Sequence, residues 1–192
     1  RKVRLARLAL AMLAGAMKTA AHPLTRDGAP EGTLLLAERQ TAGRGRGGRA
    51  WSSDARAGIW LTLIARPADE AALEALSLRV GLAAASALDP FATDDVRVKW
   101  PNDLYVESAK LAGVLVEARW RGDRLDWVAI GLGVNMDQPP DQAAAVLEAG
   151  TSRVDVICAL LPELRGSAAM SGPLTQDEMD EYAARDLARG RV

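Results

Sequence analysis

The chain has 192 residues, of which 49% are hydrophobic and 26% are charged, and its formal net charge is -1. These values fit one soluble globular domain, exclude an intrinsically disordered chain and disfavour wholesale nucleic-acid binding, which usually requires a strongly basic balance. The charge is uneven, because residues 1–56 hold 11 Lys/Arg against 4 Asp/Glu. Their net charge of +7 leaves -8 for the remainder and predicts an anionic ligand, such as a phosphate, beside the first part.

Residues 1–21 (RKVRLARLALAMLAGAMKTAA) join basic residues to a short apolar run. Several apolar residues lie near helical spacing, which predicts an amphipathic helix: Val3, Leu5, Leu8, Met12 and Leu13. A secretory signal peptide is the alternative, because such signals also place a basic region before a short apolar one. The run is too short and too interrupted for a transmembrane span.

Two strands and a helix are predicted next. Residues 32–38 (GTLLLAE) and 59–66 (IWLTLIAR) form apolar, strand-like runs on either side of a polar, glycine-rich segment. Residues 69–88 are rich in alanine and carry their larger apolar side chains at helical spacing, which predicts an amphipathic helix. Residues 95–100 (DVRVKW) form a further strand that Pro101 ends.

The second half of the chain begins with a predicted hairpin. Residues 110–120 and 124–136 are its strands, and Gly122-Asp123 lies in its turn. Three helices are predicted after it, over residues 141–149, 154–164 and 174–190. The single cysteine, Cys158, lies in the apolar run VICALL, so we expect a buried, inert thiol in a reducing compartment. Together these elements predict an α+β domain with a mixed sheet flanked by helices.

The glycine- and arginine-rich segment from Gly43 to Arg49 (GRGRGGR) is the first candidate for chemistry. Glycines let the backbone approach a ligand closely, and guanidinium groups pair with carboxylate or phosphate. The segment matches neither the Rossmann fingerprint nor the phosphate loop GxxxxGK[ST]. It therefore predicts an anion site, and a flexible RGG-like segment that binds RNA without specificity is the alternative.

The segment KWPNDLY, residues 99–105, is the second candidate. Pro101 fixes the chain direction and presents Asn102 and Asp103 at the end of a strand, where site residues are often found. Lys110 opens the next strand, so we expect its ammonium near Asp103. Such a pair would suit a charged transition state at phosphate. A surface turn with solvated charges is the alternative.

The segment GLGVNM, residues 131–136, is the third candidate. Glycines inside a strand often mark the close approach of a ligand or of another backbone. Asn135 follows them and can present both a donor and an acceptor to a base such as adenine. A bulge or turn without a ligand is the alternative.

The order of these motifs (GRGRxGRxW, KWPNDLY, KLAGVLVE and GLGVNM) resembles the catalytic domain of biotin protein ligases. The resemblance is close over residues 30–136 and loose over the C-terminal helices. It implies the fold of class II aminoacyl-tRNA synthetases and biotin synthetases. It also implies that residues 1–192 form a catalytic domain, helical over 150–192, without the N-terminal winged helix of some members and with the small C-terminal β-barrel absent or truncated.

The resemblance implies an activity in two steps. Biotin and MgATP would give biotinoyl-AMP and pyrophosphate, and a lysine of a biotin carboxyl carrier protein would then attack the mixed anhydride. Biotin and ATP would be the substrates and Mg²⁺ the metal, with no protein ligands identified for it. The expected setting is cytoplasmic, with a homodimer allowed and with no nucleic acid or membrane as partner.

The resemblance also implies roles for particular residues. Lys110, Arg46 and Asp103 would be catalytic: Lys110 would hold the biotin carboxylate and stabilise charge at the α-phosphate, and Asp103 would assist transfer or organise Mg²⁺. Trp51 would anchor the loop, and Asn135 would lie near the adenine. The expected biotin- and adenylate-binding residues are Thr19, Gln40, Gly43, Arg44, Gly45, Arg46, Trp51, Lys110, Gly113 and Asn135.

One position departs from the family pattern. Family members usually begin their first helix with Ser-Thr-Asn, whereas this chain has Met17-Lys18-Thr19 at that spacing, so that Thr19 alone offers a hydroxyl. Two alternatives to a biotin ligase therefore stay open. One is a ligase or transferase for lipoate or octanoate, and the other is an impaired relative that binds biotin without turnover.

Overall fold

The computed structural model describes residues 8–10, 21, 24–26, 28–40, 42–43, 45, 57–67, 69–137 and 144–189. In these residues the strands are β1 (Leu8–Leu10), β2 (Leu34–Ala37), β3 (Gly58–Ala65), β4 (Val96–Lys99), β5 (Asp103–Val106), β6 (Ala109–Arg121) and β7 (Arg124–Asn135). The helices are α2 (Glu70–Leu88), the short 3-10 helix η2 (Asp89–Phe91), α3 (Arg153–Ala169) and α4 (Gln176–Arg185).

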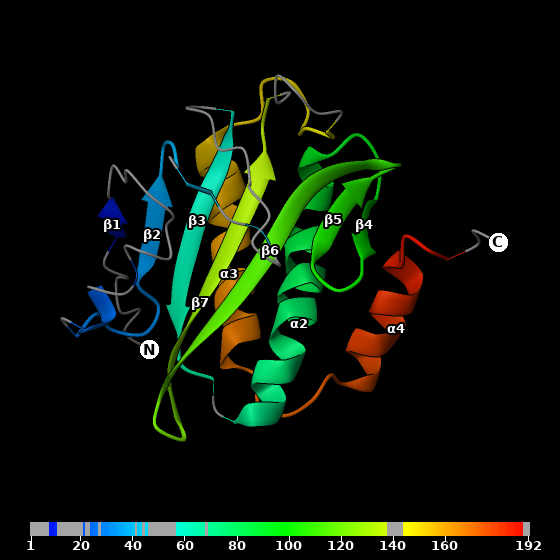
Figure 1. Ribbon diagram of the computed structural model, residues 1–192. Helices are drawn as coiled ribbons and strands as arrows, with labels where there is room; N and C mark the ends of the chain where they lie inside the picture. Colours follow the sequence, from blue (N-terminus) through cyan, green and yellow to red (C-terminus); the bar gives the residue numbers. More distant parts are fainter. Residues whose placement is uncertain are drawn as a thin grey trace, which may run out of the picture.

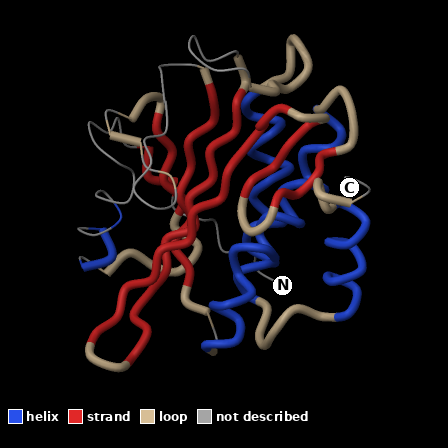
Figure 2. Tube along the Cα trace, turned by 45° about the vertical axis from the view of Figure 1, so that its right-hand side comes forward, coloured by secondary structure: helices blue, strands red, loops and turns tan. Residues whose placement is uncertain are grey.

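The strands form one mixed sheet in the order β1-β2-β3-β7-β6-β5-β4 (Figure 1). The β1–β2 pair is parallel and every other pair is antiparallel. The long β6–β7 hairpin turns at Gly122-Asp123 and extends beyond the other strands (Figures 1 and 2). The mixed sheet flanked by helices confirms the α+β prediction.

Helices α2, α3 and α4 lie together on one face of the sheet, and Figure 2 shows the sheet and these helices as two layers. Side chains alternate across a strand, so β3 serves both faces. Ile59, Leu61 and Leu63 join the main core beneath α2 and α3. Trp60 and Ile64 pack on the opposite face with residues of β2. We call that opposite face the open face, because none of α2, α3 and α4 covers it.

Polar caps fix where the helices begin. Asp69 accepts a hydrogen bond from the Ala72 N–H at the start of α2, and Ser152 accepts one from Asp155 at the start of α3. Such caps stabilise a helix by about 1 kcal/mol each. By length and composition alone the segment Glu70–Phe91 is apolar enough to cross a membrane. Here α2 is the core helix, with Val80 and Leu88 completely buried.

A buried arginine holds α4 to α2. The Arg79 side chain is 2% exposed and donates to both carboxylate oxygens of Glu178, at the start of α4, and to the Pro173 carbonyl at 2.7 Å. Glu178 also accepts from the Thr175 N–H, which completes a capping box. The guanidinium is thus matched by a carboxylate and by carbonyl oxygens, as a buried charge requires.

This contact predicts an acid-sensitive step in stability. Burial opposes ionisation of Glu178, but the hydrogen bonds from Arg79 and Thr175 and the Arg79 charge outweigh it, so the pKa of Glu178 lies below its ordinary value of 4.5. A group with a depressed pKa in the folded state contributes stability above its unfolded pKa and loses that contribution as pH falls through the folded value. We expect the free energy of unfolding to fall more steeply below pH 4.5 in the parent protein than in Glu178→Gln. Denaturant titrations at stepwise lower pH measure this, and equal slopes would contradict it.

Three sequence predictions need correction, and one strand is not indicated by the sequence pattern. Residues 8–10 form a strand rather than part of a helix, because they pair with Leu34–Leu36 of β2. Residues 144–149 are not helical: Ala144 forms a bridge with Lys110, and the Glu148 N–H donates to Phe91. Cys158 is exposed on α3, because Val156 and Leu160 occupy the buried face of that helix and Cys158 points away from it. Finally, residues 103–106 form β5, a strand that was not predicted.

Candidate active site on the open face

The centre of the candidate site is an ion pair. Asp103 is the first residue of β5 and Lys110 the second residue of β6, and these strands form an antiparallel hairpin. Lys110 lies opposite Tyr105, two residues after Asp103 on the same face, so the two side chains meet diagonally across the hairpin. The Lys110 Nζ lies 2.7 Å from the Asp103 Oδ1, and the two side chains are 30% and 27% exposed. The predicted proximity is confirmed. Both groups are half-buried, so they are held in place and still reachable by a ligand.

A row of residues leads from Asp103 across the sheet. Asp103 lies opposite Gly113, Gly113 opposite Gly133, and Gly133 opposite Trp60. Directly paired residues point to the same face, so the row lies on the open face with Trp60. The two adjacent glycines leave a strip of β6 and β7 without side chains, which a flat ligand can approach closely.

Asn135 joins the same site. It is the last residue of β7 and is 6% exposed. Its Nδ2 donates to the Lys110 carbonyl at 3.0 Å, and the Ala145 N–H donates to the same oxygen at 3.0 Å. The structure therefore brings Asn135 and Lys110 together, and the contact of Asn135 with adenine stays a prediction.

The KWPND turn is tied to the sheet. The Asn102 Nδ2 donates to the Val114 carbonyl at 2.7 Å, and the Val114 N–H donates to the Asn102 carbonyl at 2.8 Å. On the same face the Lys99 ammonium lies 5.3 Å from the centre of the Tyr105 ring. The turn is therefore tied to β6 by hydrogen bonds even though Lys99 and Trp100 are exposed, and this tie fixes the backbone next to Asp103.

The remaining predicted residues belong to the glycine–arginine segment or lie before or after it in the sequence. Gln40, Gly43 and Gly45 follow β2 and are half-buried. The other four predicted residues lie outside the described residues: Thr19, Arg44, Arg46 and Trp51. Their roles stay predictions.

The site combines the Lys110 cation with a surface of exposed main chain at Gly113 and Gly133, which suits an anionic ligand. A lysine ammonium that is held by a carboxylate can also donate a hydrogen bond to a phosphate or carboxylate ligand and neutralise part of its charge. Within the described residues, no three acidic, histidine or cysteine side chains come together as a metal cluster.

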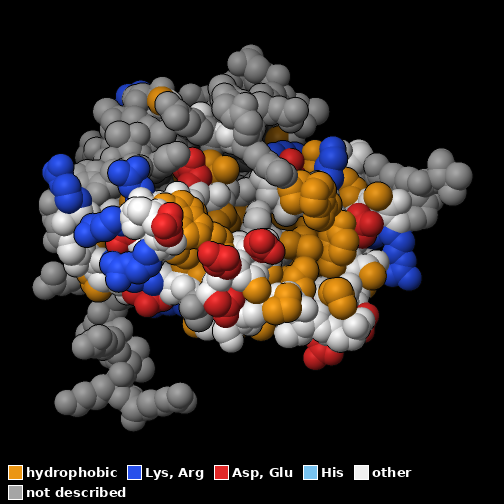
Figure 3. Space-filling model, turned by 60° about the horizontal axis from the view of Figure 1, so that its bottom comes forward, with side chains coloured by type: hydrophobic (Ala, Val, Ile, Leu, Met, Phe, Trp, Pro, Cys, Tyr) orange, Lys and Arg blue, Asp and Glu red, His pale blue; other side chains and the backbone are white. Residues whose placement is uncertain are grey.

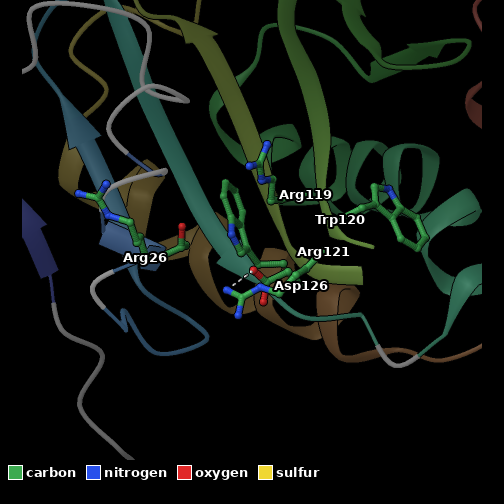
Figure 4. Close-up of a pocket in the computed structure, with 7 residues that line it drawn as sticks. Arg26, Arg119, Trp120, Arg121 and Asp126 are labelled. Atoms are coloured by element: carbon green, nitrogen blue, oxygen red, sulfur yellow. Dashed lines mark hydrogen bonds and ion pairs between the residues drawn. The ribbon is translucent and has the colours of Figure 1, made fainter. Parts of the chain in front are cut away.

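A pocket lies apart from this site, at the far end of the β6–β7 hairpin (Figure 4). It is an open hollow of about 440 Å³, and Arg26, Arg119, Arg121 and Trp127 are among its lining residues. Arg121 pairs with Asp126 at 3.3 Å. Arg119 is nine residues from Lys110 along β6, which at about 3.3 Å per residue is roughly 30 Å. On the face shown in Figure 3, basic side chains gather at one side with acidic ones beside them. The separation of roughly 30 Å along β6 places this pocket apart from the candidate active site.

The fold is that of biotin protein ligases. The structure of the Aquifex aeolicus biotin protein ligase in complex with biotin and ATP matches with a TM-score of 0.75 at 24% identity, over 96% of this chain and 80% of that one. The Leishmania major biotin protein ligase in complex with biotinyl-5-AMP matches with a TM-score of 0.72 at 22% identity, over 92% and 81%. These likenesses define the class of fold.

The sequence then identifies the family. The pattern of the biotin/lipoate A/B protein ligase family matches residues 17–135, and the chain belongs to this family. The bifunctional ligase/repressor BirA of Bacillus subtilis is 36% identical over 155 residues, which are 75% of this chain and 47% of that protein. The biotin--[acetyl-CoA-carboxylase] ligase of Mycobacterium tuberculosis is 34% identical over 172 residues, 83% of this chain and 63% of that protein. The chain thus spans 47% to 63% of the length of these two relatives.

Proposed function

We propose that this chain activates biotin with ATP and transfers it to a lysine of an acceptor protein. The observation that carries the proposal is the Lys110–Asp103 pair beside the Gly113–Gly133 strip, in a member of this family. The name of the Mycobacterium tuberculosis relative, a biotin--[acetyl-CoA-carboxylase] ligase, supports biotin as the substrate. ATP is supported by the Aquifex aeolicus complex.

The proposed first step joins two anions. A biotin carboxylate oxygen bonds to the α-phosphorus of ATP, the bond from that phosphorus to the bridging oxygen breaks, and pyrophosphate leaves. Such a reaction needs charge neutralisation more than a base, and the Lys110 ammonium supplies it. Asp103 keeps that ammonium in place on the open face. Mg²⁺ bound to the phosphates of ATP would neutralise further charge.

In the proposed second step the acceptor lysine, as a neutral amine, attacks the acyl carbon of biotinoyl-AMP. An amide bond forms, the bond from the acyl carbon to the phosphate oxygen breaks, and AMP leaves while the amine loses a proton. Asp103 is the half-buried carboxylate at this place and is proposed to orient the amine. The proposed acceptor is a biotin carboxyl carrier protein in the cytoplasm, and a homodimer is compatible with the proposal.

The glycine strip gives a test of where biotin lies. Valine in place of Gly133 would project from the open face opposite Gly113, into the space proposed for biotin. We expect Gly133→Val to weaken biotin binding at least about tenfold, because a ligand loses its contacts where a side chain intrudes. Calorimetric titration with biotin measures this, and the thermal midpoint reports whether the variant is folded. A folded variant with unchanged affinity would place biotin elsewhere.

The transfer itself tests the complete proposal. Purified chain, biotin, MgATP and a biotin carboxyl carrier domain are incubated, and the intact mass of the carrier is measured. One biotinoyl group on the carrier, absent when ATP or biotin is omitted, is the expected result. Modification only when lipoate or octanoate replaces biotin would support the sister activity, and binding of biotin without any modification would support an impaired relative.

A further inference from the structure

We infer that Arg153 and Asn135 are positioning residues that together fix the main chain of Lys110. The inference rests on the proposed function for its kinetic test, but the contacts that carry it are structural. They run from α3, through the start of β3 and the end of β7, to the first residues of β6. Each link is a hydrogen bond or a strand pair between described residues.

The first link is between Arg153 and Gly58. β2 ends at Ala37, opposite Trp60, so Gly58 lies beyond the last β2–β3 pair. Arg153 Nη1 donates to the Gly58 carbonyl at 2.7 Å, at an edge of β3 that β2 does not reach. A Cβ at Gly58 would lie 2.4 Å from the Trp60 ring and 2.5 Å from the Val134 carbonyl, so only glycine fits. The backbone here is closely confined.

The second link is between the start of β3 and the end of β7. Gly58 lies directly opposite Asn135. The preceding carbonyl, that of Ala57, accepts the N–H groups of Met136 and Asp137 at 2.9 and 3.0 Å. Holding Gly58 therefore holds the two residues that follow Asn135.

The third link is between Asn135 and Lys110. The buried Asn135 amide donates to the Lys110 carbonyl, which also accepts the Ala145 N–H. Two donors from different parts of the chain thus fix one peptide group of Lys110. Its side chain is held separately, by Asp103 at 2.7 Å. A displacement of about 1 Å at a reacting group can lower a rate about a hundredfold, so this double fixation matters for catalysis.

The same helix offers a matched control. Arg165 of α3 donates to the Gly32 carbonyl at 3.0 Å, just before β2 begins. Like Arg153, it joins α3 to a glycine carbonyl near the start of a strand. The strand in this case is β2, which does not pair with β6, the strand of Lys110. Loss of either arginine is expected to lower stability to a similar extent. Only loss of Arg153 is expected to change the site.

The kinetic test compares Arg153→Met, Arg153→Lys and Arg165→Met with the parent chain in biotin-dependent ATP–pyrophosphate exchange. We expect Arg153→Met to lower kcat about tenfold with KM for biotin and ATP within about twofold, since alignment rather than binding is lost. Arg153→Lys should restore most of kcat, because it keeps a donor for Gly58. Equal kcat values for Arg153→Met and Arg165→Met would overturn the inference, as would a loss confined to KM.

Hydrogen–deuterium exchange tests the same contacts without any activity. We expect Arg153→Met to accelerate amide exchange in peptides covering residues 57–60 and 110–114, and Arg165→Met to accelerate it in residues 32–37 only. The same exchange pattern in both variants would overturn the inference. An inactive parent chain with the expected exchange pattern would contradict the proposed function and leave the positioning contacts supported.

Discussion

Replacing Lys110 with alanine is expected to lower biotin-dependent ATP–pyrophosphate exchange by a factor of about 100 to 1,000, which is typical for loss of one preorganised donor at developing charge. The Lys110 ammonium is a cation that the structure places beside the glycine strip, and Asp103 holds it there at 2.7 Å. Without it, two anions would have to approach each other next to an unpaired carboxylate. Exchange of labelled pyrophosphate into ATP measures the effect directly.

Arg119→Ala is the matched control for this prediction. It removes one positive charge from the same strand, roughly 30 Å from Lys110 by the rise of a strand, and changes the net charge equally. We expect exchange by Arg119→Ala to stay within about twofold of the parent, since a charge so distant is screened by salt. Near-normal exchange by a folded Lys110→Ala variant would remove Lys110 from the catalytic group.

Arg79→Met is expected to cost about 3–5 kcal/mol of unfolding free energy, the usual penalty for breaking a buried ion pair by removing one partner. Arg79 is 2% exposed, and Glu178 would be left against α2 without its guanidinium. The Gly172 and Pro173 carbonyls would lose their donor as well. Denaturant unfolding followed by circular dichroism gives the free energy.

The control for Arg79 is an exposed ion pair. Arg121 is 74% exposed and lies 3.3 Å from Asp126, so Arg121→Ala should cost no more than about 1 kcal/mol. The double variant Arg79→Met/Glu178→Met should recover part of the loss, because neither side chain then leaves a buried charge unpaired. A loss below about 1 kcal/mol in Arg79→Met would show that α4 is not held by this contact.

Local patterns were sufficient for most of the fold. The apolar runs of β2 and β3, the alanine-rich α2 and the hairpin around Gly122-Asp123 lie where sequence predicts them. These elements have the periodicity or the turn residues that their structure requires. The family motifs were equally sufficient for the Lys110–Asp103 pair, because both residues lie close in sequence on the β5–β6 hairpin.

The errors come from contacts between distant segments. Residues 8–10 have a helical pattern, but they pair with β2, twenty-six residues further along the chain. Residues 144–149 have a helical composition, but Ala144 forms a β-bridge with Lys110 and the Ala145 N–H donates to the Lys110 carbonyl. Cys158 lies in an apolar run, but its neighbours Val156 and Leu160 occupy the buried face of α3. Propensity is a weak guide where pairing of this kind competes with it.

The same reason explains what the sequence could not show of the site. The contact of Asn135 with adenine stays a prediction, and the contact that the structure shows, with the Lys110 carbonyl, joins residues twenty-five positions apart. Arg153 and Gly58 are ninety-five positions apart, and no motif around Arg153 indicates its role. A side chain that acts on a distant carbonyl leaves no periodic pattern in the sequence.

Biotin-dependent ATP–pyrophosphate exchange by the purified chain is the most direct measurement of the central claim. The proposed function predicts that labelled pyrophosphate enters ATP when biotin and Mg²⁺ are present, and that neither lipoate nor octanoate replaces biotin. Exchange that appears only with lipoate or octanoate would contradict the claim, as would no exchange with any of these acids.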